Sequence, residues 1–329
     1  ILTEHLEQLN DAGVDAVIVA DLGAFTLAGK YAPNCKRHIS TQASISNYIT
    51  ANAWHDLGAS RVILARELSL EEIRTIREKT PADLEIEAFV HGAMCVSYSG
   101  RCLLSNYMTG RDASRGACAQ PCRYHYALME EKRPGEYFPI EEDEKGSYIL
   151  NSRDMCMIDH LDDLLDVGLS SLKIEGRAKS AYYAAIVTGA YRHCLDDAAA
   201  GRPIDPVWRD EVEHVSHRPY ATGFYYGYPG QYYENSRYIR EWQVVALVTE
   251  CDSDGNAVIS LRNKFRTGDT VELVGPDLRP FAMTVPEMRD ESGAVVEEPR
   301  NPQMLLKLRL PCQVPPMTLM RHQVELSAK

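Results

Sequence analysis

The sequence lacks any long apolar segment. Although 45% of its 329 residues are hydrophobic, no run approaches the roughly 18 positions that a membrane-spanning helix needs. No secretory leader is visible in it either, and the nine cysteines are an odd number. These absences argue against a membrane protein and against a small scaffold held by disulfides. We expect a cytoplasmic protein whose clustered cysteines are ligands or catalysts.

Positive charge is in the minority. The chain has 35 Lys and Arg residues and 47 Asp and Glu residues, which gives a formal net charge of -12. Such a balance argues against a protein that coats nucleic acid without specificity, but it leaves room for a local basic groove. The chain also contains neither HExxH nor GxSxG, so it offers no familiar peptidase motif.

Helix and strand patterns alternate through the first 200 residues. Leu2, Leu6 and Leu9 have helical spacing, Gly13 breaks the pattern, and a buried strand follows at 14–20. Further strands are expected at 38–42, 62–65, 84–90 and 171–174, and further helices at 46–57, 70–79, 159–167 and 181–195. This alternation predicts a parallel sheet covered by helices.

The predicted fold class is α/β, a TIM-like (β/α) barrel that is N-terminally truncated in this chain. We count five βα units, whereas a closed barrel of this type has eight. The first helix starts at Ile1 without a capping residue. About three units are therefore expected upstream of it.

The composition changes after about residue 200. A stretch dense in tyrosine, glycine and proline is expected to form an irregular connector whose rings pack between two bodies. Short alternating runs with turn signals then follow from Val244 and predict a small all-β barrel. The expected domains are the (β/α) barrel at 1–215 with a cysteine-loop insertion at 91–158, the connector at 216–242, and the small β-barrel at 243–329.

Polar residues stand where the predicted strands end. In a (β/α) barrel, the carboxyl ends of the strands form the working face. The candidates there are Asp21, Gln42, Arg66, Glu67, His91, Lys173, Glu175 and Arg177. Alternation along the last strand turns Lys173 and Glu175 toward the barrel axis. Cations, carboxylates and a histidine around one mouth suit a small anionic substrate.

The candidates divide by their chemistry. Arg66 and Arg177 are predicted to bind a substrate carboxylate, because a guanidinium can hold it through two parallel bonds. Gln42 and Glu67 are predicted as further substrate contacts. His91, Lys173 and Glu175 are predicted as catalytic groups from their positions. A buried ion-pair network is an equally plain interpretation of each single residue.

The segment after Val90 is rich in cysteine. It contains Cys95, Cys102, Cys118 and Cys122, and Cys156 follows later. Only Cys118 and Cys122 have the close spacing typical of a structural zinc site. Iron-sulfur clusters accept more varied spacing on glycine-rich loops. A cluster, a zinc ion and no metal all stay open on spacing alone. The other cysteines are interpreted as small hydrophobic residues: Cys35, Cys194, Cys251 and Cys312.

The same segment interleaves arginine with tyrosine. Arg111, Arg115 and Arg123 lie among aromatic residues such as Tyr107 and Tyr124. This mixture can hold phosphates and stack on unpaired bases, so it predicts an RNA-binding surface. Alternatively, the arginines neutralise thiolates or pair with the acidic stretch at 130–145.

Several segments resemble one known family. EAFVHGAMCVSYSGRCLLS at 87–105, HISTQAS at 38–44, SLKIEGRAKSAYY at 171–183 and RNKFRTGDTVELVGP at 262–276 are similar to the collagenase-like peptidase family, family U32. The resemblance extends over essentially the whole chain. It implies a TIM-like barrel followed by a small β-barrel similar to those of translation factors.

The resemblance implies two competing activities. The family name records a collagen-degrading peptidase, whereas other members are oxygen-independent hydroxylation proteins with a four-iron four-sulfur cluster. RPGEY at 133–137 and NSRDMC at 151–156 resemble the members that hydroxylate a tRNA uridine in a prephenate-dependent reaction. By the same resemblance, the cluster ligands are Cys95, Cys102, Cys118 and Cys156, with Cys122 as the alternative.

Hydroxylation explains more of the sequence than proteolysis does. A cysteine peptidase would use Cys95 or Cys102 with His91, but one reactive thiol does not require five cysteines. A cluster protein accounts for both the thiols and the anion-binding mouth. We therefore predict an enzyme that hydroxylates a tRNA uridine, with tRNA and a small anion such as prephenate as partners. A peptidase and a noncatalytic RNA-binding module are the alternatives.

Overall fold

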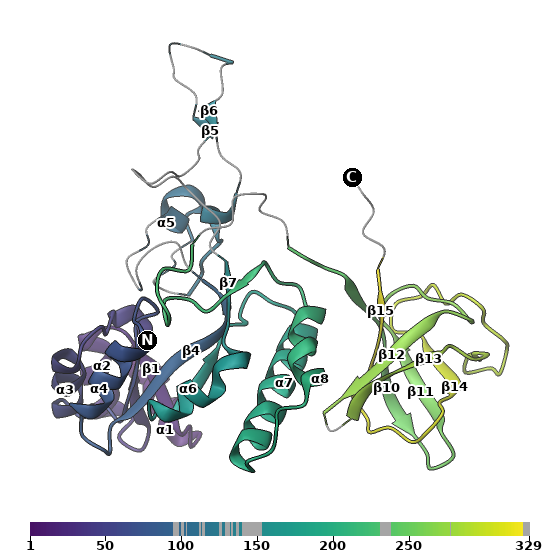
Figure 1. Ribbon diagram of the computed structural model, residues 1–329, viewed down its shortest axis with the longest axis horizontal. Coiled ribbons are helices and arrows are strands. Elements are labelled where there is room, and N and C mark those ends of the chain that lie inside the picture. Colours follow the sequence, from purple (N-terminus) through teal and green to yellow (C-terminus); the bar gives the residue numbers. More distant parts are fainter. Residues whose placement is uncertain are drawn as a thin grey trace. The chain divides into compact units, whose positions relative to one another are not determined.

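The computed structural model of the chain contains two compact units (Figure 1). The first comprises Ile1–Glu175 with Arg218–Arg237, and the second comprises Gly176–His217 with Tyr238–Lys329. The structure describes residues 1–94, 99, 102, 104–111, 113, 116–124, 127–128, 132, 134–135, 138–139, 153–230, 238–276 and 278–324. No helix in these ranges is long and apolar enough to cross a membrane.

Strands and helices alternate along the first unit, as the sequence predicts. Its elements are α1 (Leu2–Asp11), β1 (Ala16–Val19), α2 (Leu22–Tyr31), β2 (Lys36–Ile39), η1 (Thr41–Ala43), α3 (Tyr48–Asp56), β3 (Arg61–Ile63), α4 (Leu70–Glu78), β4 (Glu85–Ala93), α5 (Leu104–Thr109), η3 (Pro121–Arg123), β5 (Ala127–Leu128), β6 (Phe138–Pro139), β7 (Asp154–Cys156), η4 (Ile158–His160), α6 (Leu161–Asp166), β8 (Ser171–Ile174) and β9 (Tyr220–Ala221). This order is that of a mixed, largely parallel α/β domain.

The main sheet of this unit has seven strands. Strands β1 to β4 are parallel neighbours in chain order, and β8 pairs in parallel with β4. Two adjacent cross-strand rows show its two faces. Ile39, Val62 and Ile86 form a fully buried apolar row. The preceding row is polar and consists of His38, Arg61 and Glu85. In these two rows, one face of the sheet is apolar and the other is polar.

Two short strands extend the carboxyl end of β4. Strand β7 pairs antiparallel with His91–Ala93 of β4 (Figure 1). Strand β9 pairs in parallel with β7. Strand β4 therefore continues three residues beyond its predicted end at Val90. This pairing brings segments 154–156 and 220–221, which are distant in sequence, to the end of β4.

The structure corrects one predicted strand boundary. The strand expected at 38–42 is β2 at Lys36–Ile39, and Gln42 lies in the following turn, where its backbone N–H donates to the Ser40 hydroxyl. The apolar pattern of the sequence does not predict helix α2. Its start is set by Asp21, whose carboxylate accepts the backbone N–H of Ala24 as an N-cap. Asp21 is therefore a helix cap.

The second unit combines helices with a β domain. Its elements are α7 (Ala181–Ala199), α8 (Pro206–Glu211), η5 (Val212–His214), β10 (Trp242–Cys251), β11 (Asn256–Leu261), β12 (Thr270–Gly275), β13 (Leu278–Thr284), β14 (Leu305–Arg309) and β15 (Leu319–Gln323). The strands form one antiparallel sheet in the order β13-β12-β15-β10-β11-β14. The all-β character predicted for the domain that begins at residue 243 is confirmed.

One apolar core lies inside this sheet. All six strands contribute to it, with residues such as Val248, Ile259, Leu273, Leu306 and Met320 fully buried and Phe281 packed against them. A single sheet can supply one core from all its strands only if it curves around that core. The sheet is accordingly strongly curved.

Candidate functional site

Five residues lie at or near the carboxyl ends of β3, β4 and β8, namely Arg66, Phe89, His91, Lys173 and Glu175. We call this group the carboxyl-edge site. Strands β3 and β8 both pair with β4, so residues that follow or end these strands converge on the same edge. Four of the five are residues that the sequence predicts as catalytic or substrate-binding groups.

Phe89 is the centre of the carboxyl-edge site. The guanidinium of Arg66 lies 4.0 Å from the centroid of its ring, and the ammonium of Lys173 lies 5.7 Å away. Arg66 also donates a hydrogen bond of 3.0 Å to the Ala93 carbonyl, and its guanidinium is 3.9 Å from the Glu175 carboxylate. These contacts fix Arg66 at the sheet edge while 17% of its side chain stays exposed. A fixed and partly exposed guanidinium can accept an anionic ligand.

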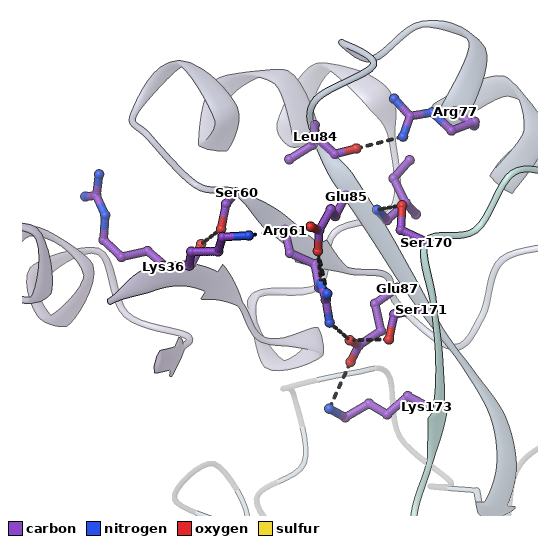
Figure 2. Close-up of polar contacts among 12 residues, drawn as sticks. Lys36, Ser60, Arg61, Arg77, Leu84, Glu85, Glu87, Ser170, Ser171 and Lys173 are labelled. Carbon is purple, nitrogen blue, oxygen red and sulfur yellow. Dashed lines mark hydrogen bonds and ion pairs between the residues drawn. The ribbon is translucent and has the colours of Figure 1, made fainter. Parts of the chain in front are cut away.

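Charged side chains continue from this site along the polar face of the sheet, as Figure 2 shows. Arg61 donates to Glu85 at 2.6 Å and to Glu87 at 2.8 Å. Glu87 also accepts hydrogen bonds from Ser171 at 2.9 Å and from Lys173 at 3.0 Å. We call these five residues the charge ladder. Since they come from β3, β4 and β8, the charge ladder links three strands below the carboxyl-edge site.

Glu87 is the buried centre of the charge ladder, with only 5% of its surface exposed. Burial acts to raise the pKa of its carboxyl group, but the hydrogen bond and charge of Lys173, together with Ser171 and Arg61, outweigh that effect and lower the pKa. Glu87 is therefore an ionised counter-ion. Lys173 forms an ion pair with it at 3.0 Å, and its predicted catalytic role stays a prediction.

His91 lies deeper, with 1% of its surface exposed. In the strand register it stands between Cys156 of β7 and Ile174 of β8. Its Nε2 is 3.4 Å from the Tyr220 hydroxyl, and the two ring centroids are 5.3 Å apart. The structure thus places one predicted cluster ligand, Cys156, on the strand beside the predicted catalytic histidine.

Gly92 lets β4 and the end of β8 approach each other. Its φ is +116°, a region that favours glycine. A Cβ atom at this position would lie 2.3 Å from the Glu175 carbonyl oxygen. The backbone N–H of Glu175 meanwhile donates to the His91 carbonyl at 2.8 Å. The position of Glu175 beside His91 therefore requires glycine at position 92.

Gln42 and Glu67 contact the cysteine segment. The side-chain amide of Gln42 donates to the Ala113 carbonyl at 3.0 Å. Glu67 accepts the backbone N–H of Ser99 at 2.9 Å and the Ser99 hydroxyl at 3.2 Å. Both residues thus attach described parts of that segment to the sheet. Their predicted role as substrate contacts stays a prediction.

The predicted metal ligands are only partly described. Cys102, Cys118, Cys122 and Cys156 are not joined in disulfides, and the Cys118 sulfur accepts the backbone N–H of Gln120 at 3.3 Å. Cys95 lies outside the described residues. Within the described ranges, no three His, Cys, Asp or Glu side chains are grouped to hold a metal ion. The cluster and its ligand set stay predictions.

The predicted RNA-binding arginines have a similar status. Arg111 is exposed, Arg115 lies outside the described residues, and only the backbone of Arg123 is described. Near them, the rings of Tyr107 and Tyr124 are 85% and 49% exposed. Arg177, a predicted substrate contact, is exposed and belongs to the second unit.

Comparison with known proteins places the chain in a family. The model for Peptidase family U32 matches residues 1–235, and the model for the Peptidase family U32 C-terminal domain matches residues 240–321. The chain belongs to peptidase family U32. The boundary between the two matches lies close to the start of β10 in this U32 protein.

Three relatives of this U32 protein are of particular interest. The tRNA hydroxylation protein P1 of Bacillus subtilis is 37% identical, over 97% of this chain and 77% of the relative. The tRNA hydroxylation protein P of Escherichia coli is 38% identical, over 82% of this chain and 69% of the relative. An uncharacterized protease of Methanocaldococcus jannaschii is 39% identical, over 83% of this chain and 68% of the relative.

A solved structure matches the second unit in part. It is the C-terminal domain of a putative U32 peptidase from Geobacillus thermoleovorans, with 31% identity and a TM-score of 0.24, and it covers 24% of this chain and 99% of that chain.

Several residues at the site of this U32 protein escaped the sequence prediction, namely Arg61, Glu87, Ser171, Tyr220 and Tyr225. Alternation was the available signal for Glu87, since it shares a strand face with Phe89 and His91. No comparable signal existed for Tyr225, which is buried and donates its hydroxyl to the Phe89 carbonyl. Burial raises the pKa of that hydroxyl, so it stays a proton donor to the carbonyl.

Proposed function

We propose that this U32 protein is an enzyme that hydroxylates a uridine of tRNA. The observation that carries the proposal is its similarity to two proteins named tRNA hydroxylation proteins, at 37% and 38% identity over 97% and 82% of the chain. The carboxyl-edge site supports it, because it gathers fixed cations, a carboxylate and a histidine where enzymes of parallel α/β folds carry their chemistry.

A small anionic co-substrate is part of the proposal. Arg66, fixed over Phe89, would hold one carboxylate of it, and the positive charge of Lys173 lies on the same ring. Prephenate, expected from the family resemblance, is such an anion and carries a hydroxyl group. If that hydroxyl is the oxygen source, the uridine C–H becomes C–OH while the donor C–OH becomes C–H, so no external oxidant is needed.

His91 and Glu175 are the proposed proton-transfer groups. Glu175 is about one third exposed beside Arg66, whereas His91 is buried against Tyr220. A carboxylate next to the bound anion can move a proton at the reacting carbon. His91, which contacts the Tyr220 hydroxyl, can pass a proton through that hydroxyl.

A four-iron four-sulfur cluster is the proposed cofactor. Its ligands would be Cys95, Cys102, Cys118 and Cys156, with Cys122 as the alternative. The donor chemistry fits, since the four described cysteines of this set are not joined in disulfides and thiolates are the usual ligands of such clusters. When bound, a cluster of this kind supplies one-electron chemistry.

The RNA would contact the cysteine segment. Arg111, Arg115 and Arg123 are the proposed phosphate contacts, and the exposed rings of Tyr107 and Tyr124 are suited to stack on unpaired bases. We also propose that the five parallel strands belong to a TIM-like barrel. Their sequential order and the position of the polar groups at their carboxyl ends support this.

The nucleosides of tRNA test the proposal directly. Transfer RNA from cells that lack this protein, and from the same cells supplied with wild type, Arg66→Ala or Arg74→Ala, is digested and analysed by mass spectrometry. We expect wild type and the exposed control Arg74→Ala to restore 5-hydroxyuridine, and Arg66→Ala to lower it at least about tenfold. If wild type yields no hydroxylated uridine, the proposed activity is wrong. Tight tRNA binding without modification would instead favour a noncatalytic module.

A peptidase is the second candidate function. The relative named an uncharacterized protease supports it, as does the register that places Cys156 opposite His91. Incubation of the purified protein with denatured collagen tests it. Cleavage that is lost in Cys156→Ser but kept in Cys35→Ser would favour a cysteine peptidase, and intact collagen would argue against any peptidase.

A further inference from the structure

Two cysteines that are far apart in sequence meet at one end of the β domain. Cys251 is the last residue of β10, and Cys312 lies in the connection between β14 and β15. The Cys251 sulfur is 3.9 Å from the Cys312 carbonyl oxygen, although 61 positions separate the residues. Both are free thiols, Cys251 half-buried and Cys312 exposed. The fold therefore makes neighbours of two cysteines that appear isolated in the sequence.

The surrounding backbone holds this neighbourhood in place. The hairpin after β10 is closed by the Asp252 carboxylate, which accepts backbone N–H groups of Asp254 at 2.9 Å and Asn256 at 2.8 Å. Gly255 at its tip accepts the backbone N–H of Leu310 at 2.8 Å. A Cβ at Gly255 would lie 2.4 Å from the Leu310 carbonyl oxygen. The segment that carries Cys312 is thus attached to the hairpin that follows Cys251.

The core anchors both ends of that segment. Leu310 and Val314 are 2% and 1% exposed and belong to the core of the β domain. Cys251 packs against the same core from β10. Only three residues, 311–313, lie between the two anchors, and all three are exposed. The segment therefore stays over Cys251, while Cys312 is open to solvent oxidants.

A metal does not explain the pair. No third His, Cys, Asp or Glu joins these cysteines in a metal-binding group within the described residues, and two thiols alone do not make a structural zinc site. A disulfide requires only the two sulfur atoms and a modest separation of the Cα atoms.

We propose that Cys251 and Cys312 form a reversible disulfide that locks the β domain under oxidising conditions. The two thiols lose two protons and two electrons, an S–S bond forms between the sulfurs, and a disulfide oxidant such as oxidised glutathione is reduced to two thiols. The exposed Cys312 reacts first, and the sheltered Cys251 then displaces the glutathione thiol. The bond would close a loop of about 60 residues and so stabilise the domain chiefly by restricting the unfolded chain.

Peptide mapping after redox equilibration tests the proposal. The purified full chain is equilibrated with mixtures of oxidised and reduced glutathione, alkylated, digested without reductant and analysed by mass spectrometry. We expect a linked pair of peptides containing Cys251 and Cys312, and a melting temperature of the β domain higher by on the order of 10 °C. Both effects should disappear on reduction.

Three variants complete the test. Cys312→Ser, at an exposed position, and Cys251→Ser should each abolish the linked peptide and the thermal shift, whereas Cys35→Ser should keep both. Stable glutathione adducts on Cys312 with a free Cys251 thiol would overturn the proposal. So would an oxidised wild type that melts at the same temperature as Cys312→Ser.

Discussion

Gly92 is the residue at which the geometry of the carboxyl-edge site depends most directly on the backbone. A side chain there would meet the Glu175 carbonyl oxygen, an atom that cannot move without shifting β8. Glu87 is the second such residue, because it is the common partner of Arg61, Ser171 and Lys173. Both residues act by fixing the positions of groups at the carboxyl-edge site.

Gly92→Ala is expected to destabilise the first unit by about 3 kcal/mol or more. The energetic cost of a strained φ adds to that of a collision between the new Cβ and the Glu175 backbone. Gly227→Ala is the matched control, because Gly227 has a similar φ of +124° but open space around its missing Cβ. Urea denaturation of the two variants measures the difference. Equal losses would show that the contact with Glu175 contributes nothing.

Glu87→Gln should lower the unfolding free energy by about 2–3 kcal/mol. This is somewhat less than the cost of breaking a fully buried ion pair, because the side chains of Lys173 and Arg61 are 30% and 24% exposed. The pKa of Glu87 is lowered in the folded state. Its stabilisation is therefore complete above the unfolded pKa of about 4.3 and is lost as the pH falls through the folded value.

Acid titration of unfolding stability should accordingly be shallower below about pH 4.3 in Glu87→Gln than in wild type. Glu78→Gln serves as the control, since Glu78 is exposed at the end of α4 and lies outside the charge ladder. A wild-type acid profile in Glu87→Gln would contradict the assigned role of the charge ladder.

At the scale of elements, the second unit depends on a buried arginine. Arg321 of β15 is fully buried and donates to Glu211 of α8 at 2.6 and 2.7 Å and to Glu272 of β12 at 2.9 Å. Its guanidinium also lies 4.8 Å from the ring centroid of Trp242 in β10. One side chain thus joins a helix to three strands of the β domain. Burial opposes its charge, but Glu211 and Glu272 outweigh that effect and raise its pKa.

Arg321→Met is expected to lower the unfolding free energy of the second unit by about 3–5 kcal/mol, because it leaves the buried Glu211 without a counter-ion. The additional change Glu211→Leu should recover part of this loss. Arg279→Met is the control, since the Arg279 side chain is 68% exposed in its pair with Asp205, and it should cost less than about 1 kcal/mol. Denaturant curves give all three values.

At the scale of the whole molecule, the cysteine segment decides the proposed function. Ala substitution of Cys95, Cys102, Cys118 or Cys156 is expected to abolish bound iron and sulfide in anaerobically purified protein, because each would supply one of four ligands. Cys194→Ala, at a fully buried position in α7, should retain both. Iron retained in Cys156→Ala but lost in Cys122→Ala would show that Cys122, and not Cys156, is the fourth ligand. Iron-free wild type would exclude the cluster.

The sequence predicts the large-scale organisation of this molecule better than its contacts. Alternation of strand and helix patterns predicts the parallel sheet, and strand ends predict Arg66, His91 and Glu175 at one edge. The partners Tyr220 and Tyr225 lie 129 and 136 positions from the residues they contact, so no local pattern could reveal them. The capping role of Asp21 could not be told from the sequence, because capping and substrate binding use the same side-chain chemistry.

The attachment of β9 to β7 also affects the order in which the site is completed during synthesis. Tyr220 follows His91 by 129 residues, so at about 5–20 residues per second the ribosome adds it about 6–26 s later. During this interval the segment with the predicted ligands, Cys95 to Cys156, is synthesised, while His91 still lacks its aromatic neighbour Tyr220. The nascent chain therefore passes through a stage in which these cysteines are already synthesised and open to oxidants, before Tyr220 reaches His91.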